Sequence, residues 1–253
     1  MRLRIHLAEG DAAAVAGVIA DLDAKHQKKP TLENSNDRAV ARLITGRYSE
    51  ALTLLRQVEK SYPGKAIVAA NLGTALELSG QNEEALGWIR TGVQRDPKEH
   101  FGTEWLHVKI LEAKIALAKD PKWLEKHSVI GLDFGTGPRP LLPVSMPLDE
   151  SGRPRTTEAI DLAIFYQLRE RTKFVAARDA IVADLYETRA NLNYAVGYDW
   201  KSGKSRPSDP VASYKTAQRY GIDDASLVLL RLQQFEKDFP GRSWGEPPAT
   251  TKP

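Results

Sequence analysis

The chain of 253 residues contains no cysteine. Disulfide bonds, zinc sites built on cysteine and thiol catalysis are therefore excluded, whereas the cellular compartment is left open. Long apolar runs are missing too: no stretch of about 18 apolar residues occurs, so the sequence predicts no membrane span. The start of the chain, Met1 to Leu7, is too short and too polar for a signal peptide, which favours the cytoplasm for the chain as given and leaves export open.

An excess of one charge is also lacking. The 36 lysines and arginines are mixed with 33 aspartates and glutamates, which gives a net charge of +3. A nucleic-acid-binding protein presents a basic face. The one small basic cluster, Lys201, Lys204 and Arg206, lies in a stretch rich in serine and glycine. We therefore expect no nucleic-acid partner.

Short motifs of common enzyme classes are absent as well. The sequence has no Gly-x-Ser-x-Gly, no His-Glu-x-x-His and no phosphate-binding Gly-x-x-x-x-Gly-Lys. Asp133-Phe134-Gly135 matches three letters of the protein-kinase metal motif, but no glycine-rich phosphate loop, strand lysine or catalytic loop accompanies it. The sequence thus predicts no catalytic residues and no cofactors, and it does not indicate an enzyme.

What the chain does contain is an internal repeat. Glycine, alanine and proline recur after 34 residues, in the pairs Gly46 and Gly80, Ala51 and Ala85, and Pro63 and Pro97. A period of about 34 residues is typical of a helix–turn–helix unit that stacks on its neighbours. The glycines end the first helix of each pair, where a left-handed residue costs least, and the prolines follow the second helix. The repeat therefore predicts helical hairpins.

The second copy carries most of the pattern. Numbered from Ala66, it supplies Ala69, Leu72, Gly73, Leu76, Ala85, Ile89 and Pro97. The copy numbered from Leu32 has Arg38 and Arg42 where the pattern has leucine and tyrosine, although its second helix fits well. Residues 35 to 99 thus resemble the tetratricopeptide repeat (TPR) family. Later segments such as Gly131-Leu-Asp-Phe-Gly are similar to a group of bacterial TPR proteins, which implies a bacterial origin and no particular activity.

The sequence predicts an all-α fold, a short right-handed solenoid of TPR-like helical hairpins with one long irregular loop. Residues 1–130 hold the repeats and a cap helix at 11–25, and residues 131–156, rich in glycine and proline, form the loop. Residues 157–239 form a second, degenerate TPR-like block, and residues 240–253 a disordered tail. Further helices are expected from near Phe101 to Ala118, at 157–172, at 179–196 and at 223–237. Residues 2–7 suit either a strand or a helix end.

The family resemblance implies a binding function: a concave groove, lined by the first helix of each hairpin, takes a peptide segment of another protein. Asn71 occupies a groove position, where its amide offers a donor and an acceptor to an extended main chain. Ala75, Phe101 and Trp105 complete the predicted peptide-binding set, and the two rings favour an apolar anchor on the ligand. Packing of both rings beneath the loop is the alternative.

His100, Glu104 and His107 follow one another at helical spacing and can together approach a divalent metal ion. Because no fourth ligand is visible, we favour structural hydrogen bonding and predict no metal site. Two alternatives to an adaptor or scaffold stay open. One is a metal-dependent or other enzyme module with its site at residues 131–156, and the other is a structural subunit that holds its own loop in the groove. The sequence leaves the partner and the oligomeric state open.

Overall fold

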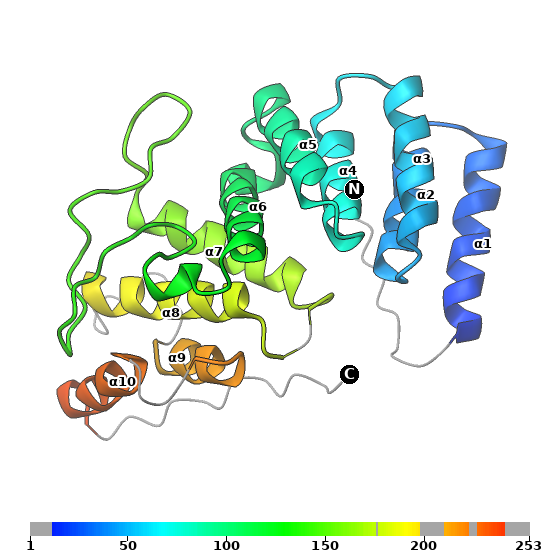
Figure 1. Ribbon diagram of the computed structural model, residues 1–253. Helices are drawn as coiled ribbons and strands as arrows, with labels where there is room; N and C mark the ends of the chain where they lie inside the picture. Colours follow the sequence, from blue (N-terminus) through cyan, green and yellow to red (C-terminus); the bar gives the residue numbers. More distant parts are fainter. Residues whose placement is uncertain (1–11, 176, 198–209, 223–226, 241–253) are drawn as a thin grey trace. The chain divides into compact units, whose positions relative to one another are not determined.

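The computed structural model describes residues 12–175, 177–197, 210–222 and 227–240 (Figure 1). All helices of these ranges are joined by irregular segments, and the one β-type pairing among the described residues is an isolated bridge between Leu148 and Pro154. The predicted all-α fold is therefore confirmed. In the same ranges no helix combines the length and apolarity needed to cross a bilayer. The predictions for residues 2–7, for the basic cluster at 201–206 and for the tail at 241–253 lie outside the described residues.

The chain divides into two compact units, Met1–Ile115 and Ala116–Pro253. The helices of the first unit are α1 (Ala12–Lys28), α2 (Leu32–Ile44), α3 (Tyr48–Ser61), α4 (Ala66–Leu78) and α5 (Asn82–Arg95), followed by α6 (Glu104–Lys119), within which the division falls. From α1 to α5, each helix packs against the next along the chain. This succession of helical hairpins is the arrangement that the repeat predicts.

The hairpin of α4 and α5 depends on a close crossing at Gly73. A Cβ atom added there would lie 2.4 Å from Cδ1 of Ile89 and 3.2 Å from the carbonyl oxygen of Ala85. Ile89 and Leu76 are fully buried beside the crossing, and Leu86 is half-buried. The predicted pairing of residues 66–79 with 82–95 is confirmed, because the connecting turn is short and its Gly80 has the left-handed φ of 79°.

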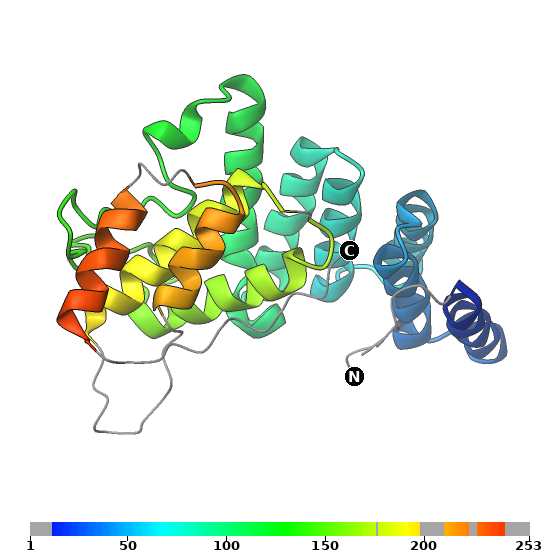
Figure 2. The same cartoon turned by 90° about the horizontal axis from the view of Figure 1, so that it is seen from below.

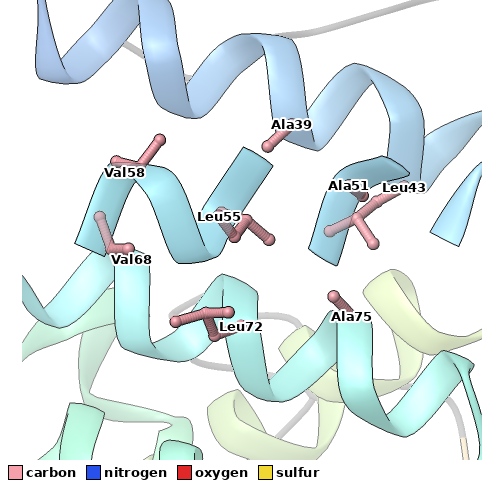
Figure 3. Close-up of a cluster of buried hydrophobic side chains, with 8 residues drawn as sticks. All are labelled: Ala39, Leu43, Ala51, Leu55, Val58, Val68, Leu72 and Ala75. Atoms are coloured by element: carbon pink, nitrogen blue, oxygen red, sulfur yellow. The ribbon is translucent and has the colours of Figure 1, made fainter. Parts of the chain in front are cut away.

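A continuous apolar core joins α2, α3 and α4 (Figure 3). Small side chains alternate with branched ones in this cluster, which consists of Ala39, Leu43, Ala51, Leu55, Val58, Val68, Leu72 and Ala75. The alanines allow the helix backbones to approach, and the leucines and valines fill the remaining space. Successive hairpins are thus fused by one core, as a stacked repeat requires.

The start of α6 differs from the prediction. His100, Phe101 and Gly102 have φ values of 49°, 63° and 69°, which lie in the left-handed region. An α-helix requires φ near −63°, so these residues cannot belong to it. The helix predicted from near Phe101 therefore begins three residues later, at Glu104, after a left-handed turn.

The second unit contains α7 (Thr157–Arg171), α8 (Ala180–Val196), α9 (Pro210–Arg219) and α10 (Leu227–Asp238), with a short 3-10 turn at Trp123–Glu125. α8 packs against both α7 and α9, and α9 packs against α10 (Figure 2, green-yellow to red). Thr156 and Asp179 cap α7 and α8 by accepting the backbone N–H groups of Ala159 and Val182. The helices predicted at 157–172 and 179–196 are confirmed to within one residue at each end.

Residues 131–156 form the predicted irregular loop, which precedes α7. The loop is folded back on itself: the N–H of Leu141 donates to the carbonyl oxygen of Phe134 at 2.9 Å, and the N–H of Arg155 donates to that of Pro147 at 2.8 Å. These backbone bonds within the loop give it a defined path in the second unit.

Candidate functional site

Two amide side chains, called here the amide pair, link α2 and α4, which are the first helices of two successive hairpins. Nδ2 of Asn71 on α4 donates to Oδ1 of Asn36 on α2 at 2.8 Å. Both side chains are half-buried. Each amide has two N–H donors and one oxygen with two lone pairs, so this single bond occupies only part of what the pair offers. Asn71 is thus half-buried on α4 and linked to α2, and its predicted role in peptide binding stays a prediction. Asn36, which the sequence reasoning missed, joins it.

Ala75 lies elsewhere. It is fully buried in the core of α2, α3 and α4 (Figure 3). A side chain without exposed surface offers nothing to a ligand in this conformation. Its neighbours Asn71 and Thr74 on α4 are half-buried and keep some exposed surface.

Phe101 and Trp105 belong to the left-handed turn and to the first turn of α6. Phe101 is 58% exposed, whereas Trp105 is half-buried. A non-glycine residue in the left-handed region costs about 1–3 kcal/mol, and two of them follow one another here. The turn is secured by Thr103, whose Oγ1 donates to the carbonyl oxygen of His100 at 2.8 Å. The backbone thus holds an aromatic ring toward solvent at a strained position.

The turn ends in a buried network of charged side chains. Nδ1 of His100 lies 2.6 Å from Oε1 of Glu104, whose Oε2 lies 3.3 Å from Nδ1 of His107. Nε2 of His107 lies 2.7 Å from Oε2 of Glu77 on α4, and Nζ of Lys114 lies 2.6 Å from Oε1 of Glu77. The structural hydrogen bonding predicted for His100, Glu104 and His107 is confirmed. Glu77 and Lys114 were missed, and sequence spacing gives no signal for either.

Geometry decides the charge of His107. Both ring nitrogens face a carboxylate, and an ionised carboxylate can only accept. Both nitrogens must therefore carry protons, which makes the ring a cation between two anions. Burial lowers the pKa of His107, but the hydrogen bonds that its ring donates to Glu104 and Glu77 outweigh this effect and leave the pKa raised. Burial raises the pKa of Glu104, but hydrogen bonds from the two histidines lower it to about 2.

The network therefore joins α4 to α6 by ion pairs. Each of the imidazole nitrogens of His107 and each carboxylate oxygen of Glu77 and Glu104 is engaged by a side chain of the network. Among the described residues, no group of three or more His, Cys, Asp or Glu side chains is arranged to hold a metal ion. The arrangement is suited to fixing the position of the aromatic turn relative to α4.

The second unit has a polar interior of its own. Arg231 on α10 is almost completely buried, and it donates to the carbonyl oxygens of Phe134, Gly135 and Gly137 in the loop. Burial raises the pKa of the Asp184 carboxyl on α8 to about 7, although the N–H of Val129 donates to it at 2.9 Å. Sequence analysis found neither group. In the sequence, the sole hint of this contact is an arginine next to the apolar residues of α10, which can donate hydrogen bonds to backbone carbonyl groups of the loop.

Comparison of the sequence with protein-family models and with curated proteins finds no match in either.

Proposed function

We propose that the protein is an adaptor or scaffold that binds an extended segment of another protein across the first helices α2, α4 and α6. The TPR resemblance of residues 35 to 99 belongs to the same proposal. Solenoids of helical hairpins present such surfaces by construction, since their first helices line one side of the stack.

The observation that carries the proposal is the amide pair. Asn36 and Asn71 bridge two successive first helices at 2.8 Å. The two amides keep further donors and acceptors beyond this bond, and an extended main chain presents donors and acceptors in alternation. A row of amides can thus bind a backbone without regard to its sequence.

The aromatic turn supplies the complement, an apolar anchor point. Trp105 follows Asn71 by 34 residues, so it occupies the equivalent repeat position on α6. Phe101, in the left-handed turn before α6, is largely exposed. Aromatic side chains provide large contact area with few rotatable bonds, and they are frequent among residues that dominate binding energy. The ionic network below the turn holds the aromatic end in place before a ligand arrives, which reduces the entropy lost on binding.

To test the proposal, peptides that bind the full chain are selected from a phage-displayed library of random sequences. Affinities of the selected peptides are then measured by calorimetry for the wild type, Asn71→Ala and Phe101→Ala. We expect Asn71→Ala to weaken binding by about 1–3 kcal/mol, because it removes polar partners of a bound main chain. Phe101→Ala should weaken it by about 2 kcal/mol or more.

Gln57→Ala is the matched control, since it removes an exposed amide from α3, the second helix of its hairpin. It should leave the affinity unchanged. The proposal is wrong if no peptide is selected. It is equally wrong if selected peptides bind Asn71→Ala and Phe101→Ala as tightly as the wild type.

A further inference from the structure

The loop of the second unit exposes an aliphatic stretch, called here the apolar segment, Leu141–Leu148. Leu141 is 67% exposed and Leu148 is 60% exposed, while Leu142 is about half exposed and Val144 is fully exposed. Single exposed leucines are ordinary, but four large aliphatic side chains exposed within eight residues are not. Such a concentration on a folded protein indicates an interaction site.

On its N-terminal side, the apolar segment is held in a defined shape by hydrogen bonds of the preceding residues. Arg231 donates to three carbonyl oxygens of residues 134–137, which precede the segment by a few residues. Arg139 forms two hydrogen bonds to the carboxylate of Asp238, which also accepts the hydroxyl of Tyr194 at 2.6 Å. Pro140 and Pro143 are buried and so face away from the solvent.

On its C-terminal side, the apolar segment is held by a second set of hydrogen bonds. Oδ1 of Asp149 accepts the backbone N–H groups of Ser151 and Arg153, both at 2.9 Å, and this closes a turn. Leu148 is bridged to Pro154, and the N–H of Arg155 bonds to Pro147. The apolar segment is thus displayed between two fixed ends, and little conformational entropy remains to be lost when it is covered.

Two common partners fit this surface poorly. Pro143 and Pro147 lack N–H groups, and the N–H of Leu141 is already used within the loop, so the segment cannot add as a strand to a sheet edge. An anionic membrane would require basic residues beside the apolar ones. The arginines of the loop are instead paired with carboxylates: Arg139 with Asp238, Arg153 with Asp149, and Arg155 with Glu150.

The same neutrality favours a second copy of the chain. In a two-fold contact each surface meets its own duplicate, so a rim of one charge sign would repel itself. Here the rim is internally paired and the centre is aliphatic, which is compatible with self-contact. We propose that the apolar segments of two copies pack against each other about a two-fold axis near Val144, the most exposed of their side chains.

The size of the contact sets the expected strength. A standard interface involves roughly 20–30 residues on each side, more than one eight-residue segment and its neighbours provide. The dimer should therefore be weak, with a dissociation constant of about 10–100 μM. Side-chain packing without strand pairing also limits the assembly to pairs, since no open sheet edge is formed.

Sedimentation velocity of the full chain from about 1 μM to about 500 μM tests the proposal. The wild type should pass from monomer to dimer, and Leu142→Lys should remain monomeric throughout. Leu162→Lys is the matched control: Leu162 is exposed to a similar extent on α7, so this variant should dimerise like the wild type. Thermal melting identifies any variant that fails to fold.

A charge-swap experiment then tests the two-fold axis. Val144→Lys and Val144→Glu should each be monomeric alone, whereas an equal mixture should recover dimers because opposite charges then face each other. A wild type that stays monomeric, or that sediments as a monomer but floats with anionic phospholipid vesicles, overturns the proposal. So does a dimer that Leu142→Lys leaves intact, or a mixture that recovers nothing.

Discussion

α4 makes two joints of opposite chemistry with adjacent residues. Leu76 faces the apolar joint with α5, where Gly73, Ala85 and Ile89 pack without space for a further carbon. Glu77, the next residue, faces the ionic joint with α6, where it meets His107 and Lys114. Apolar packing depends on volume and is indifferent to pH, whereas a buried ion pair depends on every partner being present and correctly protonated. α4 therefore makes one contact whose stability is independent of pH, with α5, and one whose stability depends on the protonation of its partners, with α6.

The ionic joint should break most severely when its central cation is removed. His107→Ala leaves Glu77 and Glu104 buried without the imidazolium between them. Removing one partner of a buried ion pair costs about 3–5 kcal/mol, so the free energy of unfolding should fall by that amount. Urea unfolding at pH 6 measures it. His127→Ala is the control, because His127 is exposed and stacks on Trp123 rather than on a residue of the network. An equal loss in both variants would show that the joint is not specially stabilising.

The apolar joint should break when volume is added. Gly73→Leu places side-chain atoms where Ile89 and the carbonyl oxygen of Ala85 already lie, and overpacking of this kind costs about 1–3 kcal/mol or somewhat more. Gly87→Leu is the matched control on α5, where a Cβ meets nothing within 4 Å. It should gain up to about 1 kcal/mol from helix propensity. Urea midpoints of the two variants decide the matter, and a stable Gly73→Leu protein would contradict the close crossing.

Changes of pH should separate the two joints without mutation. The pKa of His107 is raised in the folded state, so its contribution is complete below the unfolded pKa of about 6.5 and is lost as the pH rises through the folded value. Stability should therefore fall, by up to about 1.4 kcal/mol per pH unit, as the pH rises above about 6.5. Asp184, whose pKa is raised to about 7, also changes charge in the lower part of this range, and it is present in both proteins of the comparison that follows. Urea unfolding of His107→Gln should show a flatter profile over the same range, and an unchanged slope would refute this assignment.

On the acid side the sign reverses. The pKa of Glu104 is lowered to about 2 in the folded state, so its contribution is present above the unfolded value of 4.5 and is lost as the pH falls toward 2. The ionic joint should thus be strongest between about pH 4.5 and 6.5. Unfolding of Glu104→Gln over pH 2.5 to 4.5 should show less pH dependence than the wild type.

A third joint gives the smallest expected effect. Asp23 on α1 accepts Arg38 at 2.7 Å and Arg42 at 2.8 Å, but its carboxylate is partly exposed to solvent. Solvent-exposed ion pairs contribute about 0–1 kcal/mol. Arg38→Leu, which installs the residue of the repeat pattern, should therefore change the unfolding free energy by less than about 1 kcal/mol in either direction. If urea unfolding showed that the free energy of unfolding falls by several kcal/mol, the Asp23 ion pairs would contribute as much as the buried network of His107, which would contradict this prediction.

The same joint explains why the first repeat copy is weak. Arg38 and Arg42 break the apolar pattern, and the structure pairs both with Asp23. A search for the repeat pattern, which has leucine and tyrosine at these positions, counts both arginines as mismatches. Their carboxylate partner lies on the preceding helix, at a distance along the chain that the repeat period does not specify.

The sequence by itself determined the helical hairpins and most of their ends. The 34-residue recurrence of glycine, alanine and proline depends on contacts between helices that are neighbours along the chain, and caps such as Thr156 and Asp179 act within one turn. Only the tertiary structure decided how His107 meets Glu77, how Arg231 reaches the carbonyls of the loop, and how His100 and Phe101 turn left-handed where local preference continues a helix. The physical reason is that a hydrogen bond or ion pair between distant residues leaves no periodic trace in the sequence, because it requires one atom in one place rather than a repeated face.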